Sequence, residues 1–230
     1  MNTQDITYAG QSYPVQYRPG TMDEGVLDQI NRCHDHDLSR LPFWDDILRF
    51  YEANKRRDKP LLIVDGGAHI GIASVWFHLM FPQAKILAYE LNEENFKVLQ
   101  ENTRKIPQML TCNQALMGSS GFYQEADPGQ GNWGFRATAG ETGKAGVTLD
   151  RIYGYASRRH IPFIVKLDVE GEEENILRNH AGWLSQTPVV MVECHNWVKD
   201  WSVFDVLRHG RECQDMGANV ISVDRGLLGA

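Results

Sequence analysis

The sequence predicts an α/β fold, a three-layer sandwich with a mostly parallel central sheet and an N-terminal extension, and three observations support it. Short apolar runs that suit buried strands alternate with helical patterns along most of the chain. Such alternation requires right-handed crossovers, which place helices on both faces of a largely parallel sheet. Hydrophobic residues make up 42% of the 230 residues, enough for the core of one large domain.

The N-terminal extension is expected to comprise residues 1–58, ahead of the alternating domain at 59–230. Its segment ITYAGQSYPVQYRP predicts a hairpin, and helical patterns follow at 23–32 and 43–55. We expect this extension to cap a substrate or to contact another copy of the chain. Strands of the domain are expected at 61–64, 85–89, 110–115, 163–167, 189–193 and 219–223. The Gly-rich stretch 129–146 is expected to be a long, mobile loop.

The segment LLIVDGGAHIG, residues 61–71, combines an apolar strand, an acid at its end and a glycine-rich turn that opens a helix. A dinucleotide fingerprint would need G-x-G-x-x-G here, but Ala68 stands where its central glycine should be. The pattern D-x-G-x-x-x-G is instead similar to motif I of class I S-adenosylmethionine-dependent methyltransferases, whose loop wraps the methionine end of the cofactor. The cofactor contacts expected from this loop are Asp65, Gly66, Gly67, Ala68, His69 and Gly71.

Two further strand ends supply the rest of the expected cofactor site. Glu90 ends the strand at 85–89, and an acid in this place of a nucleotide-binding α/β fold reaches the ribose hydroxyls. Its alternative role, capping the following helix, is already filled by Asn92 and the two glutamates after it. Beyond the third strand, the amide of Gln114 and the backbone N–H of Ala115 are expected to bind adenine, although Gln114 could also simply begin a turn.

Linked motifs closely resemble the FkbM family of methyltransferases. They are VDGGAHIG at 64–71, VTLDRI at 147–152, VKLDVEGEEENIL at 165–177, VVMVECHN at 189–196 and the entry segment GTMDEGVLDQI at 20–30. The resemblance implies a Rossmann-like catalytic domain at 59–230 that uses S-adenosylmethionine to O-methylate hydroxyls on sugars, polyketides or related small molecules. His69 departs from the family, which more often has asparagine there, and this leaves the polar contact at that position open.

Asp168 is the first candidate for the general base, because it ends the strand where class I methyltransferases commonly place catalytic residues. Glu193 and His195 flank Cys194 and should project to the same side of an extended strand end. His195 would match neutral pH better as a base, with Asp168 or Glu193 orienting it. The three residues could also hold a divalent ion such as Mg²⁺. Glu170 is expected to have a scaffolding role, bound to backbone N–H groups or to Lys166.

Two tryptophans and a polar cluster are candidates for contacts with the acceptor. Trp133 and Trp197 are expected to stack on the acceptor. The cluster at 33–37, Cys-His-Asp-His-Asp, is interpreted as a polar junction between helices with room for a substrate contact, because close sequence neighbours rarely point at one metal ion.

Composition narrows the choice of partners and cellular location. The net charge of −7 disfavours a nucleic-acid substrate. Scattered cysteines, the absence of a signal-peptide pattern and the absence of a long apolar run predict a cytoplasmic protein without a membrane span. A homo-oligomer is compatible with the sequence. Three alternatives stay open: a small-molecule N-methyltransferase, a dinucleotide-dependent oxidoreductase, and a cofactor-binding protein without activity.

Overall fold

The computed structural model describes residues 1–126, 136–179, 182–195, 202–207 and 210–229. Its central sheet contains β3 (Leu61–Gly66), β4 (Lys85–Tyr89), β5 (Met109–Cys112), β10 (Ile161–Leu167), β11 (Val189–Glu193), β12 (Glu212–Met216) and β13 (Asn219–Val223). The seven strands lie in the order β12-β13-β11-β10-β3-β4-β5, and β13 runs antiparallel to both of its neighbours. The five strands from β11 to β5 are parallel, as the sequence predicts.

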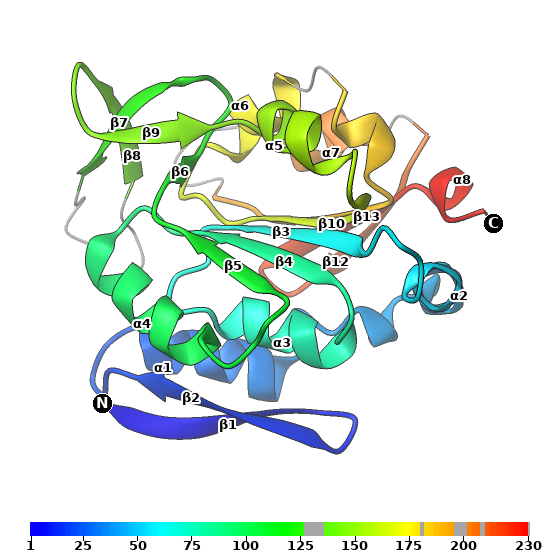
Figure 1. Ribbon diagram of the computed structural model, residues 1–230, viewed down its shortest axis with the longest axis horizontal. Coiled ribbons are helices and arrows are strands. Elements are labelled where there is room, and N and C mark those ends of the chain that lie inside the picture. Colours follow the sequence, from blue (N-terminus) through cyan, green and yellow to red (C-terminus); the bar gives the residue numbers. More distant parts are fainter. Residues whose placement is uncertain (127–135, 180–181, 196–201, 208–209, 230) are drawn as a thin grey trace.

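Helices cover both faces of this sheet and form the outer layers (Figure 1). One face carries α1 (Asp23–Asp28), α3 (Ile72–Met80) and α4 (Glu93–Thr103); the other carries α5 (Leu149–Ala156), α6 (Glu173–Arg178) and α7 (Val203–Leu207). The helices α2 (Trp44–Asn54) and α8 (Arg225–Leu228) lie near one end of the sheet. In the described part of the chain, no helix has the length and apolar character needed to cross a membrane.

The central strand β3 shows why the sheet needs both layers, since all six of its residues are buried. Leu61 and Ile63 join the hydrophobic cluster on the α3 side, whereas Leu62 and Val64 join the cluster on the α5 side. Successive side chains of a strand point to opposite faces. A continuous apolar run therefore fits a strand that is covered on both sides.

The predicted hairpin is confirmed as β1 (Asn2–Tyr8) and β2 (Gln11–Tyr17). Its two-residue turn has positive φ at Ala9 (48°) and Gly10 (80°), the conformation that matches the twist of a tight hairpin. Ile6 and Val15 join the hydrophobic cluster that contains most of α3. The hairpin thus adds a further layer outside α3 (Figure 1). The expected domain boundary at residue 58 stays a prediction.

Hydrogen bonds of Asn102 hold the hairpin against α4. The backbone N–H of Gln16 donates to Oδ1 of Asn102 on α4 at 2.7 Å, while Nδ2 of Asn102 donates to the carbonyl oxygens of Gln16 and Ile70. Asn102 is itself buried, so these bonds satisfy an amide that would otherwise be costly to bury.

Two local expectations are wrong. The described part of the Gly-rich stretch is not a loop, because β8 (Arg136–Gly140) and β9 (Lys144–Val147) form a small sheet with β6 (Ala115–Leu116) and β7 (Gly121–Ala126). The third core strand ends at Cys112, since Ala115 already pairs in the small sheet. The helical pattern expected at 23–32 is confirmed, and it changes after Asp28 from an α-helix into a π-helical turn, Gln29–Cys33.

Candidate active site

A cavity of about 400 Å³ opens at the carboxyl ends of β3, β4, β10 and β11, where ligands of parallel α/β sheets bind. Six of the nine predicted cofactor residues line it, and so do all three predicted catalytic residues. They are Gly67, Ala68, His69, Glu90, Gln114, Ala115, Asp168, Glu193 and His195.

The glycine-rich loop is held against the neighbouring strand by its own backbone. The N–H groups of Gly67 and Ala68 both donate to the carbonyl oxygen of Tyr89, at 3.0 and 2.9 Å. The other three predicted loop residues do not line the cavity. Asp65 accepts a hydrogen bond from Ser74 (2.6 Å), the backbone of Gly66 lies against Leu116, and Gly71 begins α3.

Gly67→Ala is expected to lower the melting temperature and to disrupt the loop. Gly67 has a φ of 74°, and a Cβ atom there would collide with the carbonyl oxygen of Asp168. Either the glycine-rich loop or the end of β10 must move. The loop and Asp168 would then lie farther apart. Thermal unfolding checks this, with Gly154→Ala as the control, because a Cβ at Gly154 meets nothing within 4 Å. Equal melting temperatures for both variants would contradict the tight contact.

Glu90 clamps the loop to the start of α4. Its carboxylate accepts hydrogen bonds from the backbone N–H groups of His69 and Asn92, both at 2.8 Å. Asn92 caps α4 through its own side chain, as expected. Burial raises the pKa of Glu90 to about 7, although the two N–H groups oppose this change. Glu90 still lines the cavity, so its carboxylate has lone pairs left that could accept further hydrogen bonds there.

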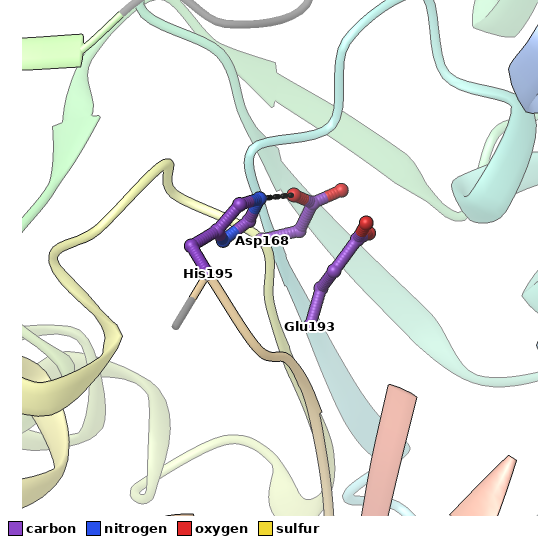
Figure 2. Close-up of side chains that lie close together, drawn as sticks. All are labelled: Asp168, Glu193 and His195. Atoms are coloured by element: carbon purple, nitrogen blue, oxygen red, sulfur yellow. Dashed lines mark ion pairs between the residues drawn. The ribbon is translucent and has the colours of Figure 1, made fainter. Parts of the chain in front are cut away.

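The three predicted catalytic residues converge from two neighbouring strand ends (Figure 2). One ligand atom from each of Asp168, Glu193 and His195 lies within 4.8 Å of the others. Nε2 of His195 is 3.9 Å from Oδ1 of Asp168, the ion pair drawn as a dashed line in Figure 2. Sequence spacing alone could not establish this convergence.

Lys166 provides a buried positive charge beneath these acids. Its Nζ lies 3.0 Å from Oδ2 of Asp168 and 3.5 Å from Oδ1 of Asp65. Burial lowers the pKa of Lys166, but Asp168, Asp65 and Glu193 outweigh this effect and raise it, so the ammonium stays charged. A lysine inside the apolar run FIVKL is a signal in the sequence that a buried acid must lie nearby.

The two carboxyl groups of the site have pKa values that are shifted in opposite directions. Burial raises the pKa of Asp168, but Lys166 and His195 outweigh it and hold that pKa below its usual value. The negative charge of Asp168, followed by burial, raises the pKa of Glu193 to about 8. At neutral pH Asp168 is therefore ionised while Glu193 carries a proton, a division typical of acid and base pairs.

His195 is not the near-neutral base that the sequence suggests. Burial lowers its pKa, but hydrogen bonds to Glu170 and Glu173 and the charges of the acids raise it to about 11. Its Nδ1 lies 2.9 Å from Glu173 and its Nε2 lies 3.4 Å from Glu170. The imidazolium thus holds neighbouring acids in place.

The scaffolding role expected of Glu170 belongs to Glu173, which the sequence analysis does not single out. Glu173 accepts hydrogen bonds from the backbone N–H groups of Val169 and Gly171, both at 2.9 Å. Glu170 instead faces His195, and Lys166 is held by Asp65 and Asp168.

Two tryptophans that the sequence assigns to acceptor stacking, Trp133 and Trp197, lie outside the described residues.

Solved methyltransferases resemble the chain only distantly. The plantazolicin methyltransferase BpumL in complex with SAH is 12% identical, covering 74% of this chain and 50% of that chain, with a TM-score of 0.38. Precorrin-6y C5,15-methyltransferase from Geobacter metallireducens is 12% identical over 75% and 83%, with a TM-score of 0.41. WbdD is 10% identical over 86% and 42%, with a TM-score of 0.46. The chain thus spans about half the length of the BpumL chain.

The family comparison covers most of the described site. No curated protein is detectably similar to the chain in sequence. The model of the methyltransferase FkbM domain matches residues 65–215, which include the glycine-rich loop, Glu90, Asp168 and His195. The mostly parallel seven-stranded sheet is the α/β architecture that the sequence predicts for this domain. The chain belongs to the FkbM family of methyltransferases.

Proposed function

We propose that the protein transfers a methyl group from S-adenosylmethionine to a hydroxyl of a small-molecule acceptor, such as a sugar or a polyketide. The observation that carries the proposal is that the glycine-rich loop, Glu90 and an ionised Asp168 line one cavity. The net charge of −7 favours such an acceptor over a nucleic acid. A cytoplasmic location and a homo-oligomer stay predictions.

Asp168 is the proposed general base. The cofactor supplies an activated methyl group on a sulfonium, and in-line transfer depends mainly on holding the reacting atoms close and collinear. The pKa of an alcohol is close to that of water, about 15, so its proton must leave as the new oxygen–carbon bond forms. The carboxylate of Asp168 accepts this proton, and S-adenosylhomocysteine leaves. Lys166 and His195 keep Asp168 ionised and oriented, and the protonated Glu193 can donate a hydrogen bond to the acceptor.

A divalent ion at Asp168, Glu193 and His195 fits poorly with the basic groups that already neutralise this site. Lys166 already lies 3.0 Å from Asp168, and His195 would have to give up its proton while Glu170 and Glu173 stabilise the charged form. We therefore expect activity to survive chelation with EDTA. A requirement for added Mg²⁺ after chelation would show that the metal prediction is right and the proposed base mechanism incomplete.

Calorimetric titration with S-adenosylhomocysteine, beside NAD as a control, is the first test. Binding of S-adenosylhomocysteine alone supports the proposed cofactor, whereas binding of NAD alone supports the oxidoreductase alternative. A screen of hydroxyl- and amine-bearing acceptors, with EDTA and with Mg²⁺, then follows methyl transfer by mass spectrometry. Methylated amines without methylated hydroxyls would support the N-methyltransferase alternative.

Cofactor affinity is expected to rise with pH because Glu90 must be ionised to accept both ribose hydroxyls. The pKa of Glu90 is raised to about 7 by burial, so the ionised fraction grows between pH 6 and pH 8. The affinity for S-adenosylhomocysteine should grow about tenfold over this range, in proportion to that fraction. Calorimetry at several pH values measures it. Glu90→Gln should bind more weakly and show a flat profile; an unchanged slope in that variant would assign the titration to another group.

A further inference from the structure

The N-terminal segment, including part of the entry segment 20–30, forms one wall of the cavity. Gly25 and Val26 of α1, Gln29 of the π-helical turn and His36 all line the same space as the glycine-rich loop. The segment is fixed there by Arg18, whose guanidinium bonds Asp23 at 2.7 Å. Residues that precede the catalytic motifs can therefore contact the cofactor.

His36 is the most unusual residue of this wall. Its side chain is only 4% exposed, and neither ring nitrogen has a hydrogen-bond partner among the described residues. The position of the residue is nevertheless fixed, because Trp76 donates from Nε1 to the carbonyl oxygen of His36 and the ring lies against Phe77. A buried polar group without a partner is costly, so its presence at a cavity points to a ligand.

The character of that ligand follows from the charges around the cavity. Burial lowers the pKa of His36 to about 3, so the ring is neutral and offers one N–H donor. The first turn of α3 also borders the cavity, through Ile72 and Ala73. Its N–H groups have no acceptors within the helix and carry the positive end of the helix dipole. A neutral donor and a helix N-terminus that line the same cavity favour a carboxylate.

The cofactor contains one carboxylate, on its amino-acid end, and the rest of the cavity suits it less well. The ionised Asp168 would repel it near the proposed general base. Glu90 would do the same beside the ribose. The cavity-lining residues of α1, the π-helical turn and the first turn of α3 include no acid in the described part of the chain, although the charges of Lys166 and Asp168 both act on His36.

We propose that His36 of the N-terminal segment, together with the first turn of α3, binds the carboxylate of the cofactor's amino-acid end. The inference rests on the proposed use of S-adenosylmethionine. It gives the N-terminal segment a direct part in cofactor binding and does not depend on the identity of the acceptor.

The test compares two ligands that differ only at this end. S-adenosylhomocysteine carries the amino acid, and 5′-methylthioadenosine lacks it. His36→Leu is expected to weaken S-adenosylhomocysteine roughly 10- to 100-fold, the effect of one hydrogen bond to a charged group, while the affinity for 5′-methylthioadenosine stays unchanged. His36→Gln, which keeps an N–H donor, should retain most of the affinity. His78→Leu is the matched control, because His78 also has a buried ring nitrogen without a partner but does not line the cavity.

Each outcome of the calorimetry is informative. Selective loss of S-adenosylhomocysteine binding in His36→Leu supports the inference, whereas equal weakening of both ligands, or of neither, overturns it. Should the leucine variant fail to fold, the ring ¹⁵N signals of the unaltered protein decide: His36 must respond to S-adenosylhomocysteine and not to 5′-methylthioadenosine. If the unaltered protein binds 5′-methylthioadenosine with the same affinity as S-adenosylhomocysteine, only this inference fails. Binding of neither ligand would overturn the proposed function as well.

Discussion

Asp168→Asn is expected to lower turnover at least ~100-fold while the affinity for S-adenosylhomocysteine stays nearly unchanged. The amide has the same shape as the carboxylate but cannot take the acceptor's proton. Lys166 keeps one anionic partner in this variant, because Asp65 lies 3.5 Å from its Nζ. The site should therefore remain folded and loaded with cofactor while the chemical step fails.

The measurement for this variant is the initial rate with an acceptor found in the screen, beside calorimetry with S-adenosylhomocysteine. Glu212→Gln serves as a control for the loss of one carboxylate, since Glu212 is half-exposed at the sheet edge and pairs only with Arg225 among the described residues. Normal turnover in Asp168→Asn would remove Asp168 from the role of base and leave Glu193 as the next candidate. A parallel loss of cofactor affinity would instead show a binding role.

Glu173→Ala is expected to destabilise the protein by about 3–5 kcal/mol, the usual effect of removing one partner from a buried ion pair. Glu173 is fully buried, and its carboxylate is shared by two backbone N–H groups and the ring of His195. Its removal leaves all of them without this acceptor. The loop after β10 also carries Glu170 at a φ of 56°, a strained conformation that these bonds help to maintain.

Urea unfolding of Glu173→Ala measures this effect, and the neighbouring residue provides the control. Glu174 lies on the same helix but forms a more exposed pair with Arg178, so Glu174→Ala should change the free energy of unfolding little. Similar losses in both variants would mean that helix α6, rather than the buried carboxylate, determines the result.

Strands that are buried and apolar could be predicted closely from the sequence. The expected ranges 85–89, 189–193 and 219–223 coincide with β4, β11 and β13, because each is an apolar run between turn residues. The edge strand β12, with the sequence ECQDM, escaped prediction because three of its five residues are exposed and its pattern is polar. The small sheet of β6 to β9 was not predicted because glycines, which usually indicate a loop, also permit close pairing of strands.

The sequence predicts the site residues that lie at the ends of neighbouring parallel strands, because the carboxyl ends of such strands meet at one edge of the sheet. Asp168 and Glu193 end two such strands, β10 and β11. The charge state of His195 was not predictable, since it depends on contacts with Glu170 and Glu173 that only the fold creates. His36 lies far from Asp168 in sequence, and no periodicity indicates that the two border the same cavity.

The hairpin outside α3 also bears on how the chain is made. Ribosomes synthesise β1 and β2 before their partners on α3 and α4, which emerge only after residues 72–103 have been synthesised. An isolated two-stranded hairpin is marginally stable in water. Ile6 and Val15, both fully buried in the folded protein, must therefore remain exposed during that interval. Chaperones that shield nascent chains should engage this stretch until α4 has left the exit tunnel, and Asn102 can then fasten Gln16 in place.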